Sequence, residues 1–207
     1  MDFKDRIIEL ENKTDNEDFL YLQGSNKVLL TAPHSVEQSL DEGVKLSEPY
    51  TKAIALYVAS ELNLNALVKV RDTSIDANKD EYEDFKTEQR RIINNNGILL
   101  SLDIHGASVL RDFDIELGTI NNLSADYSTI NELKEAFQEQ GLNVVINDPF
   151  KGGAVTKNVY GFTDAEAIQI EVNRKLRNIE NIDGLKKVCD ALINFIKQYI
   201  ETTKRWG

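Results

Sequence analysis

Two histidines are the only imidazole side chains in this chain of 207 residues, and both follow apolar segments. His34 comes shortly after the apolar run at 27–32, and His105 follows directly after the run at 97–104. If these runs are neighbouring strands of an open α/β sheet, their carboxyl ends lie at the edge where such folds bind ligands. We therefore expect both imidazoles to line one crevice.

A metal site is the chemistry that this pair of histidines supports best. Glu37 follows His34 by three residues, a spacing that places two side chains on the same face of a helical turn. Together with His105 they would form a His-Glu-His set that binds zinc and leaves a fourth position for water. The alternative is that both histidines are structural residues at strand ends, bonded to backbone carbonyls. No His-Glu-x-x-His run occurs, which excludes that metalloprotease motif.

Glu171 is a charged residue within an otherwise apolar strand pattern at 167–172. Successive side chains of a strand point to opposite faces, so Glu171 lies on the face away from the isoleucines beside it. A carboxylate in such a segment is costly unless it has a partner or a function. The structural alternative is a salt bridge to Arg174 or Arg177.

Two further features accompany these residues. Asp103 lies two residues before His105 on the same strand face, where it would orient the imidazole or have a purely structural role. Gly152 and Gly153 permit close approach of the backbone to a ligand, or only a sharp turn. They belong to a long predicted loop at 148–163, and loops of this length are often functional.

The elements that must position these residues alternate between strands and helices. Strands are predicted at residues 19–22, 27–32, 66–70, 97–104, 113–117, 142–146 and 167–172. Helices are predicted at residues 53–62, 82–95, 130–140 and 185–200, and the Ser-Glu-Pro sequence at 47–49 predicts the start of the first one. This alternation predicts an α/β fold with a mixed, largely parallel sheet.

Composition and charge exclude several classes of protein. The chain is 41% hydrophobic and 29% charged, which is typical of a folded protein and fits one domain over residues 1–207. Its 35 acidic residues against 24 Lys and Arg give a net charge of −11, so no nucleic-acid partner is expected. No run approaches the ~18 apolar residues of a membrane span. The first residues lack the apolar core of a secretory signal. A single cysteine, Cys189, is consistent with a cytoplasmic protein.

Five segments, taken in order, resemble the N-formylglutamate amidohydrolase family. More distantly, they resemble zinc carboxypeptidases and the aspartoacylase/succinylglutamate desuccinylase group. The segments are residues 32–35, 71–79, 103–106, 147–153 and 168–174. None of them is specific alone, and their order along the chain is what carries the resemblance.

The resemblance implies a phosphorylase/hydrolase-like fold, a three-layer α/β sandwich, with zinc held by His34, Glu37 and His105. It further implies that Glu171 is the general base and acid and that Arg71 polarises the oxyanion. The implied substrate-binding residues are Asn78, Lys79, Gly152, Gly153 and Arg174. Arg90, Arg91 and Arg111 are further cations that would assist. Lys79 stands where this group of enzymes usually has arginine, so it presents a point charge instead of a bidentate fork.

The expected function is zinc-dependent hydrolysis of an amide or peptide bond adjacent to a substrate carboxylate. The substrate would be a small anionic N-acyl amino acid or peptide. One alternative is a metallo-carboxypeptidase or γ-glutamyl peptide hydrolase, which differs in whether the 148–163 loop closes the pocket or leaves a groove. The other is a non-catalytic ligand-binding relative, which does not need a complete set of metal ligands and base.

Overall fold

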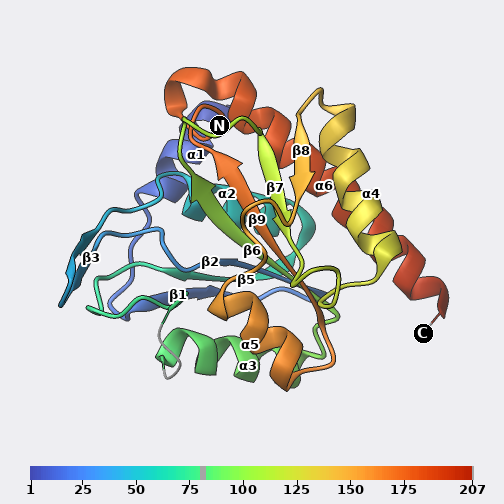
Figure 1. Ribbon diagram of the computed structural model, residues 1–207, viewed down its shortest axis with the longest axis horizontal. Helices are drawn as coiled ribbons and strands as arrows, with labels where there is room; N and C mark the ends of the chain where they lie inside the picture. The colour runs from blue at the N-terminus through green and yellow to red at the C-terminus, as the bar shows by residue number, and fades with distance from the viewer. Residues whose placement is uncertain (80–82, 207) are drawn as a thin grey trace.

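A seven-stranded mixed sheet lies between two layers of helices in this computed structural model, and a two-stranded hairpin projects beside it (Figure 1). The structure describes residues 1–79 and 83–206, with side chains described through Thr203. The predicted three-layer α/β fold with a mixed, largely parallel sheet is therefore confirmed.

The order of strands across the sheet is β1-β5-β2-β6-β9-β7-β8. These strands are β1 (Phe19–Leu22), β2 (Asn26–Ala32), β5 (Leu64–Lys69), β6 (Leu100–Ala107), β7 (Ile115–Gly118), β8 (Val144–Ile146) and β9 (Glu166–Asn173). Strands β5, β2, β6 and β9 run parallel in the centre, whereas β1 and β7 are antiparallel to their inner neighbours. The hairpin consists of β3 (Gln38–Leu40) and β4 (Gly43–Lys45).

Helices cover both faces of the sheet (Figure 1). One layer consists of α1 (Phe3–Glu11), α2 (Thr51–Leu62), α4 (Tyr127–Glu139) and α6 (Ile182–Trp206), which follows the short 3₁₀ helix η1 (Ile179–Asn181). The other layer consists of α3 (Asp84–Asn96) and α5 (Ala154–Phe162). No helix in the described part of the chain combines the length and apolar character needed to cross a membrane.

The strands alternate between two apolar cores because successive side chains point to opposite faces. In β2, for example, Val28 and Leu30 contribute to the core under α1, α2, α4 and α6, whereas Leu29 contributes to the core under α3 and α5. The second core is smaller and contains few strand residues, among them Leu29, Leu67 and Ala167. Toward the carboxyl ends, the same face carries polar residues such as His105 and Glu171.

Most predicted strands and helices are confirmed to within a few residues, but two local predictions are wrong. Helix α2 begins at Thr51 instead of at 47, and its N-cap, Tyr50, has a left-handed backbone with φ of 66°. The segment before it is held extended, because the Glu48 amide donates to the carbonyl of His34 (2.8 Å). The predicted loop at 148–163 contains helix α5. Tyr82, the predicted first residue of the second helix, lies outside the described residues.

Core packing predicts a large effect for Leu102, a fully buried residue of the central strand β6. Leu102→Ala would leave a cavity in a close-packed interior, and the free energy of unfolding should fall by about 2–5 kcal/mol. Leu123→Ala, at a position that is 62% exposed, is the control and should change it by less than about 0.5 kcal/mol. Urea unfolding followed by circular dichroism measures both. Similar effects for the two variants would contradict the assignment of Leu102 to the core.

Candidate active site

A cavity of about 410 Å³ opens at the carboxyl ends of the parallel strands β2, β6 and β9. Its titratable lining residues are His34, Lys45, Glu48, His105, Arg111, Lys151 and Glu171. His34 lies in the turn after β2, whereas His105 lies inside β6 and Glu171 inside β9. The two histidines therefore share one crevice, as their positions after apolar runs predicted.

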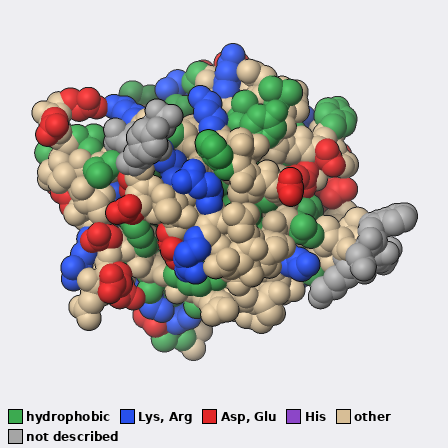
Figure 2. Space-filling view, turned by 90° about the horizontal axis from the view of Figure 1, so that it is seen from below, with side chains coloured by type: hydrophobic (Ala, Val, Ile, Leu, Met, Phe, Trp, Pro, Cys, Tyr) green, Lys and Arg blue, Asp and Glu red, His purple; other side chains and the backbone are tan. Residues whose placement is uncertain are grey.

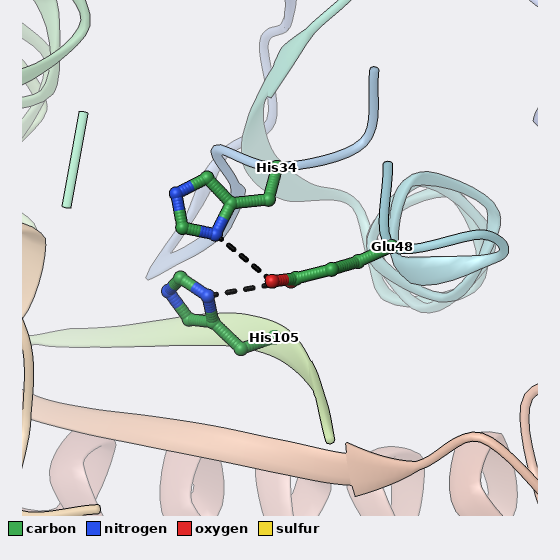
Figure 3. A group of neighbouring side chains, drawn as sticks. All are labelled: His34, Glu48 and His105. Atoms are coloured by element: carbon green, nitrogen blue, oxygen red, sulfur yellow. Dashed lines mark hydrogen bonds and ion pairs between the residues drawn. The ribbon is translucent and has the colours of Figure 1, made fainter. Parts of the chain in front are cut away.

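Three of these side chains converge on one point (Figure 3). Nδ1 of His34 lies 3.0 Å from one carboxylate oxygen of Glu48, and Nδ1 of His105 lies 3.4 Å from the other. One ligand atom from each residue lies within 4.8 Å of the other two. Tetrahedral zinc with ligands at ~2.1 Å has ligand-to-ligand distances of about 3.4 Å, close to these values. The group thus has the donor types of a metal site, with ligand atoms close enough together for one cation.

The opposite nitrogens of both rings are held by buried carboxylates. Nε2 of His34 lies 2.8 Å from Asp76, and Nε2 of His105 lies 2.8 Å from Asp103. A carboxylate only accepts, so a hydrogen on either Nε2 is donated outward, and a ring with its hydrogen there has an Nδ1 lone pair available for a metal. In that tautomer the two Nδ1 atoms and the Glu48 carboxylate are three lone-pair donors that a cation between them would stabilise. Carboxylates in this position are also typical partners of metal-binding histidines.

The two buried carboxylates are themselves held in place. Thr31 donates its hydroxyl to Asp103 (2.6 Å), and Lys45 of the β3–β4 hairpin donates to Asp76 (2.9 Å). Asp76 also accepts the backbone amide of Asn78 (2.9 Å). The orientation of each imidazole therefore depends on a chain of contacts that reaches β2 on one side and the hairpin on the other.

Glu48, and not Glu37, is the carboxylate that the structure places beside the histidines. The helical turn assumed for residues 34–37 does not form, and Glu37 is exposed after a non-helical turn that leads into β3. The sequence did not single out Glu48 as a ligand, because Ser-Glu-Pro at 47–49 is typical of a helix start. The feature that would have favoured Glu48 is its place as an acidic residue in the connection that returns from the hairpin to α2.

Arg177 is a buried guanidinium that joins three segments around the site. Its nitrogens donate to the carbonyls of Val172 (3.0 Å), Pro49 (2.9 Å) and Ala107 (3.2 Å). These carbonyls lie in β9, next to Glu48, and at the end of β6. A side chain at Gly106 would overlap the guanidinium, so only glycine fits there. Arg177 therefore ties the backbone that carries Glu48 to the strands that carry His105 and Glu171.

The charges in this cluster shift one another's pKa values. Burial alone would raise the pKa of Glu48, but the hydrogen bonds and charges of His105 and His34 lower it well below its usual range. Burial disfavours protonation of His105, whereas Asp103 and Glu48 together raise its pKa well above the ordinary value. The carboxylates of the site thus stabilise positive charge between His34, Glu48 and His105.

Glu171 lies opposite His105 in the parallel ladder of β6 and β9 and is 6% exposed. Gln169 donates to its Oε1 (2.7 Å), which leaves Oε2 without a hydrogen bond from the described residues. Burial is the main reason that its pKa is raised to about 7, while His105 and Gln169 oppose this shift and Glu48 supports it. Neither predicted partner pairs with it, since Arg174 is exposed and Arg177 binds carbonyls. A buried carboxyl with a pKa near neutrality is suited to proton transfer.

Asn78, Gly152 and Gly153 line the cavity, as the sequence analysis expected of substrate-binding residues. The backbone carbonyl and side-chain Oδ1 of Asn78 accept the first amides of α5, from Ala154 (3.3 Å) and Val155 (3.2 Å). A Cβ at Gly153 would overlap the Asn78 side chain, which explains the need for glycine there. Asn78 therefore caps α5 and also lines the cavity.

Three basic residues that were expected near the substrate lie elsewhere. Arg71, Lys79 and Arg174 are exposed, and none of them lines the cavity. Lys79 pairs with Glu42 (2.5 Å) and borders a separate groove between α3 and α5, which Lys157 also lines. Figure 2 views the molecule from below, and Lys and Arg side chains lie near the middle of that face. The basic residues of the cavity are Lys45, Arg111 and Lys151 instead.

Solved structures of amide and peptide hydrolases share this fold. An N-formylglutamate amidohydrolase from Ralstonia eutropha JMP134 is 14% identical with a TM-score of 0.67, and the match covers 90% of this chain and 99% of that one. A bacteriophage poly-gamma-glutamate hydrolase is 13% identical with a TM-score of 0.60, covering 93% and 95%. A metallo-carboxypeptidase from Burkholderia cenocepacia is 16% identical with a TM-score of 0.53, covering 87% and 61%. These similarities define the fold class.

The family relationship is visible in the sequence as well. Residues 75–177 match the family model of N-formylglutamate amidohydrolase (FGase), which confirms the relationship to this amidohydrolase family that the five segments predicted. The matched range contains His105 and Glu171 but not His34 or Glu48. No curated protein sequence matches the chain.

The raised pKa of Glu171 predicts a pH-dependent loss of stability in the metal-free protein. Its folded-state pKa of about 7 lies above the ordinary value of 4.5. Protonation of this carboxyl therefore favours the folded state, and the contribution is lost as the pH rises through about 7. Relative to Glu171→Gln, which cannot ionise, the wild-type free energy of unfolding should fall by roughly 2–3 kcal/mol between about pH 4.5 and about pH 8. Urea unfolding at each pH measures this difference, and a constant value would show that Glu171 ionises normally.

Proposed function

We propose that this protein is a zinc-dependent hydrolase that cleaves the amide bond of a small N-acyl amino acid, adjacent to a substrate carboxylate. The observation that carries the proposal is the convergence of His34, Glu48 and His105 on one point, with the protonatable carboxyl of Glu171 in the same cavity. Membership of an amidohydrolase family supports the reaction class.

His34, Glu48 and His105 would hold the metal through two Nδ1 atoms and one carboxylate. When bound, zinc supplies Lewis-acid polarisation of the scissile carbonyl and lowers the pKa of water. The Nε2 contacts to Asp76 and Asp103 would favour the tautomer of each ring that binds a metal through Nδ1. Three protein ligands would leave a position for water or substrate, as in catalytic zinc sites.

Glu171 would take a proton from the attacking water at Oε2 and return it to the nitrogen of the leaving amine. Gln169 holds Oε1 and so fixes the direction in which Oε2 points. Because the pKa of this carboxyl is about 7, both protonation states are accessible at neutral pH, which the two half-steps require. The Nδ2 group of Asn78, which also lines the cavity, would donate to a substrate oxygen, since its Oδ1 accepts from α5.

Two alternatives use the same geometry. A metallo-carboxypeptidase or γ-glutamyl peptide hydrolase needs room for a longer chain, and the fold of a poly-gamma-glutamate hydrolase is similar to this one. Here residues 149–153 line the cavity directly before α5, and this favours a small substrate. A non-catalytic ligand-binding relative would not need His34, Glu48, His105 and Glu171 together in one cavity.

Metal binding should depend on Glu48 and not on Glu37. Glu48→Gln removes one of three charged or lone-pair ligands and should weaken zinc binding by at least about 100-fold, as should His34→Ala. Glu37→Gln is the matched control, since it changes an exposed carboxylate three residues from His34, and should leave about one zinc per chain. Elemental analysis of protein purified without chelator, followed by competition with a zinc-binding dye, gives content and affinity. Loss of zinc in Glu37→Gln with retention in Glu48→Gln would contradict the assigned ligand set.

Replacement of Glu171, the proposed base, should lower the rate of hydrolysis without changing metal binding. Glu171→Gln keeps the shape of the side chain but cannot accept a proton, so kcat for N-formyl-L-glutamate should fall by roughly 10²–10⁴-fold. Zinc content should stay at the wild-type level, because Glu171 is not among the converging ligands. Glu135→Gln, on the exposed face of α4, controls for loss of a negative charge. A Glu171→Gln variant with full zinc and wild-type kcat would remove Glu171 from the mechanism.

A further inference from the structure

Glu48, the carboxylate beside the histidines, belongs to a segment with an unusual backbone. Tyr50, two residues further along, has φ of 66°, a left-handed conformation that a bulky residue rarely adopts. Tyr50 is also the N-cap of α2, and its side chain makes no capping hydrogen bond to the described first turn at 51–54. A strained residue of this kind persists only where surrounding contacts hold it. The contacts that hold Tyr50 therefore also bear on Glu48.

The missing cap is supplied by Glu11, the last residue of α1. One oxygen of its carboxylate accepts the amide of Tyr50 (2.9 Å), and the other accepts the amide of Ala53 (3.3 Å). These are the two amides that a capping box satisfies from within a helix. A carboxylate at this end also interacts favourably with the helix dipole. Glu11 thus caps α2 from a different helix.

Further contacts fix α1 against α2. Lys52, which is 5% exposed, donates its ammonium to the carbonyl of Lys13 (3.0 Å), just beyond the end of α1. The rings of Phe3 and Tyr57 pack edge to face, with their centroids 5.0 Å apart. The two helices lie side by side in one layer (Figure 1). Because these contacts set the relative position of the helices, Glu11 has little freedom to move away from α2.

The capped end of α2 is joined directly to Glu48. Thr51 donates its hydroxyl (2.8 Å) and its amide (3.3 Å) to the Glu48 carbonyl. On the other side, the Glu48 amide donates to the carbonyl of His34 (2.8 Å). The carboxylate of Glu48 accepts the amide of Gly106 (2.9 Å) through the oxygen that faces His105. The place of this carboxylate therefore depends on where the end of α2 is held.

We propose that Glu11 is a positioning residue for Glu48: by capping α2, it holds the segment 48–50 in the conformation that brings the Glu48 carboxylate to both histidines. This inference rests on the proposed function, which makes Glu48 a metal ligand. Arg177, which donates to the Pro49 carbonyl (2.9 Å), holds the same segment from the side of the sheet. Helix α1 supplies none of the described residues that line the cavity, yet it contributes to metal binding through this cap.

The test removes the cap and follows the Glu48 carboxylate in two ways. In the metal-free protein, the Gly106 amide reports directly on this carboxylate, and its proton resonance in NMR spectra should move upfield in Glu11→Ala as the charge-assisted hydrogen bond weakens. With zinc, the same variant should bind the metal roughly 10–100-fold more weakly, measured by competition with a zinc-binding dye. Glu11→Gln keeps one acceptor oxygen and should lie between the wild type and Glu11→Ala.

Ile7→Ala separates positioning from a general loss of stability. Ile7 is a fully buried residue of α1, so this change should lower the midpoint of urea unfolding at least as much as Glu11→Ala does. It leaves the cap in place, so the Gly106 resonance should not move and the zinc affinity should stay within about threefold of the wild type. Glu9→Gln, at an exposed position of α1 that pairs with Arg6, controls for the lost charge.

The two measurements also separate this inference from the proposed function. Wild-type zinc affinity or an unmoved Gly106 resonance in Glu11→Ala would overturn the inference, as would changes of equal size in Ile7→Ala. If the wild type binds no zinc, the proposed function fails, and the Gly106 resonance alone then decides whether Glu11 positions the Glu48 carboxylate.

Discussion

The electrostatic balance around the carboxylate of Glu48 is the interaction on which the site depends. Two imidazole nitrogens lie within 3.0–3.4 Å of this carboxylate. Positive charge on or between these groups, from protonated imidazole or from a bound metal, stabilises the buried carboxylate, which would otherwise be costly. The outer carboxylates Asp76 and Asp103 contact the Nε2 atoms and so fix the orientation of both rings. Arg177 and the hydrogen bonds of the hairpin then hold the backbone segments against the same point.

The sheet explains how a polar centre of this size is placed inside a stable protein. One face is apolar along its whole length under four helices, and this supplies the larger core. The other face has a smaller apolar core under α3 and α5, and it carries polar residues toward the carboxyl ends of β6 and β9. The cost of burying His105 and Glu171 is thus confined to one end of one face, where each has a hydrogen-bond partner.

The fold was predictable from the sequence, as was the meeting of His34, His105 and Glu171 in one cavity, and the residues placed differently share one cause. Strands with period-two patterns were located to within a few residues. The positions of His105 and Glu171 on the sheet followed from those strands. Glu37 was preferred to Glu48 because local spacing was taken as helical, whereas the chain leaves His34 through a turn and a hairpin. Arg71, Lys79 and Arg174 were expected at the cavity, which Arg111 lines instead, because the connections that carry them were judged by sequence alone. Helix α5 was missed for the same reason.

What the sequence by itself determined is the set of side chains that alternate along the buried strands. Period two places Asp103 with His105, and Gln169 with Glu171, on the same face of the sheet whatever the connections do. The tertiary structure decided which loop residues meet them. Glu48 reaches the histidines only because β3 and β4 return the chain to the end of β2, and Arg111 contacts Phe150 only because that residue arrives from beyond β8. Contacts between distant segments depend on the path of the whole chain, and no local pattern encodes that path.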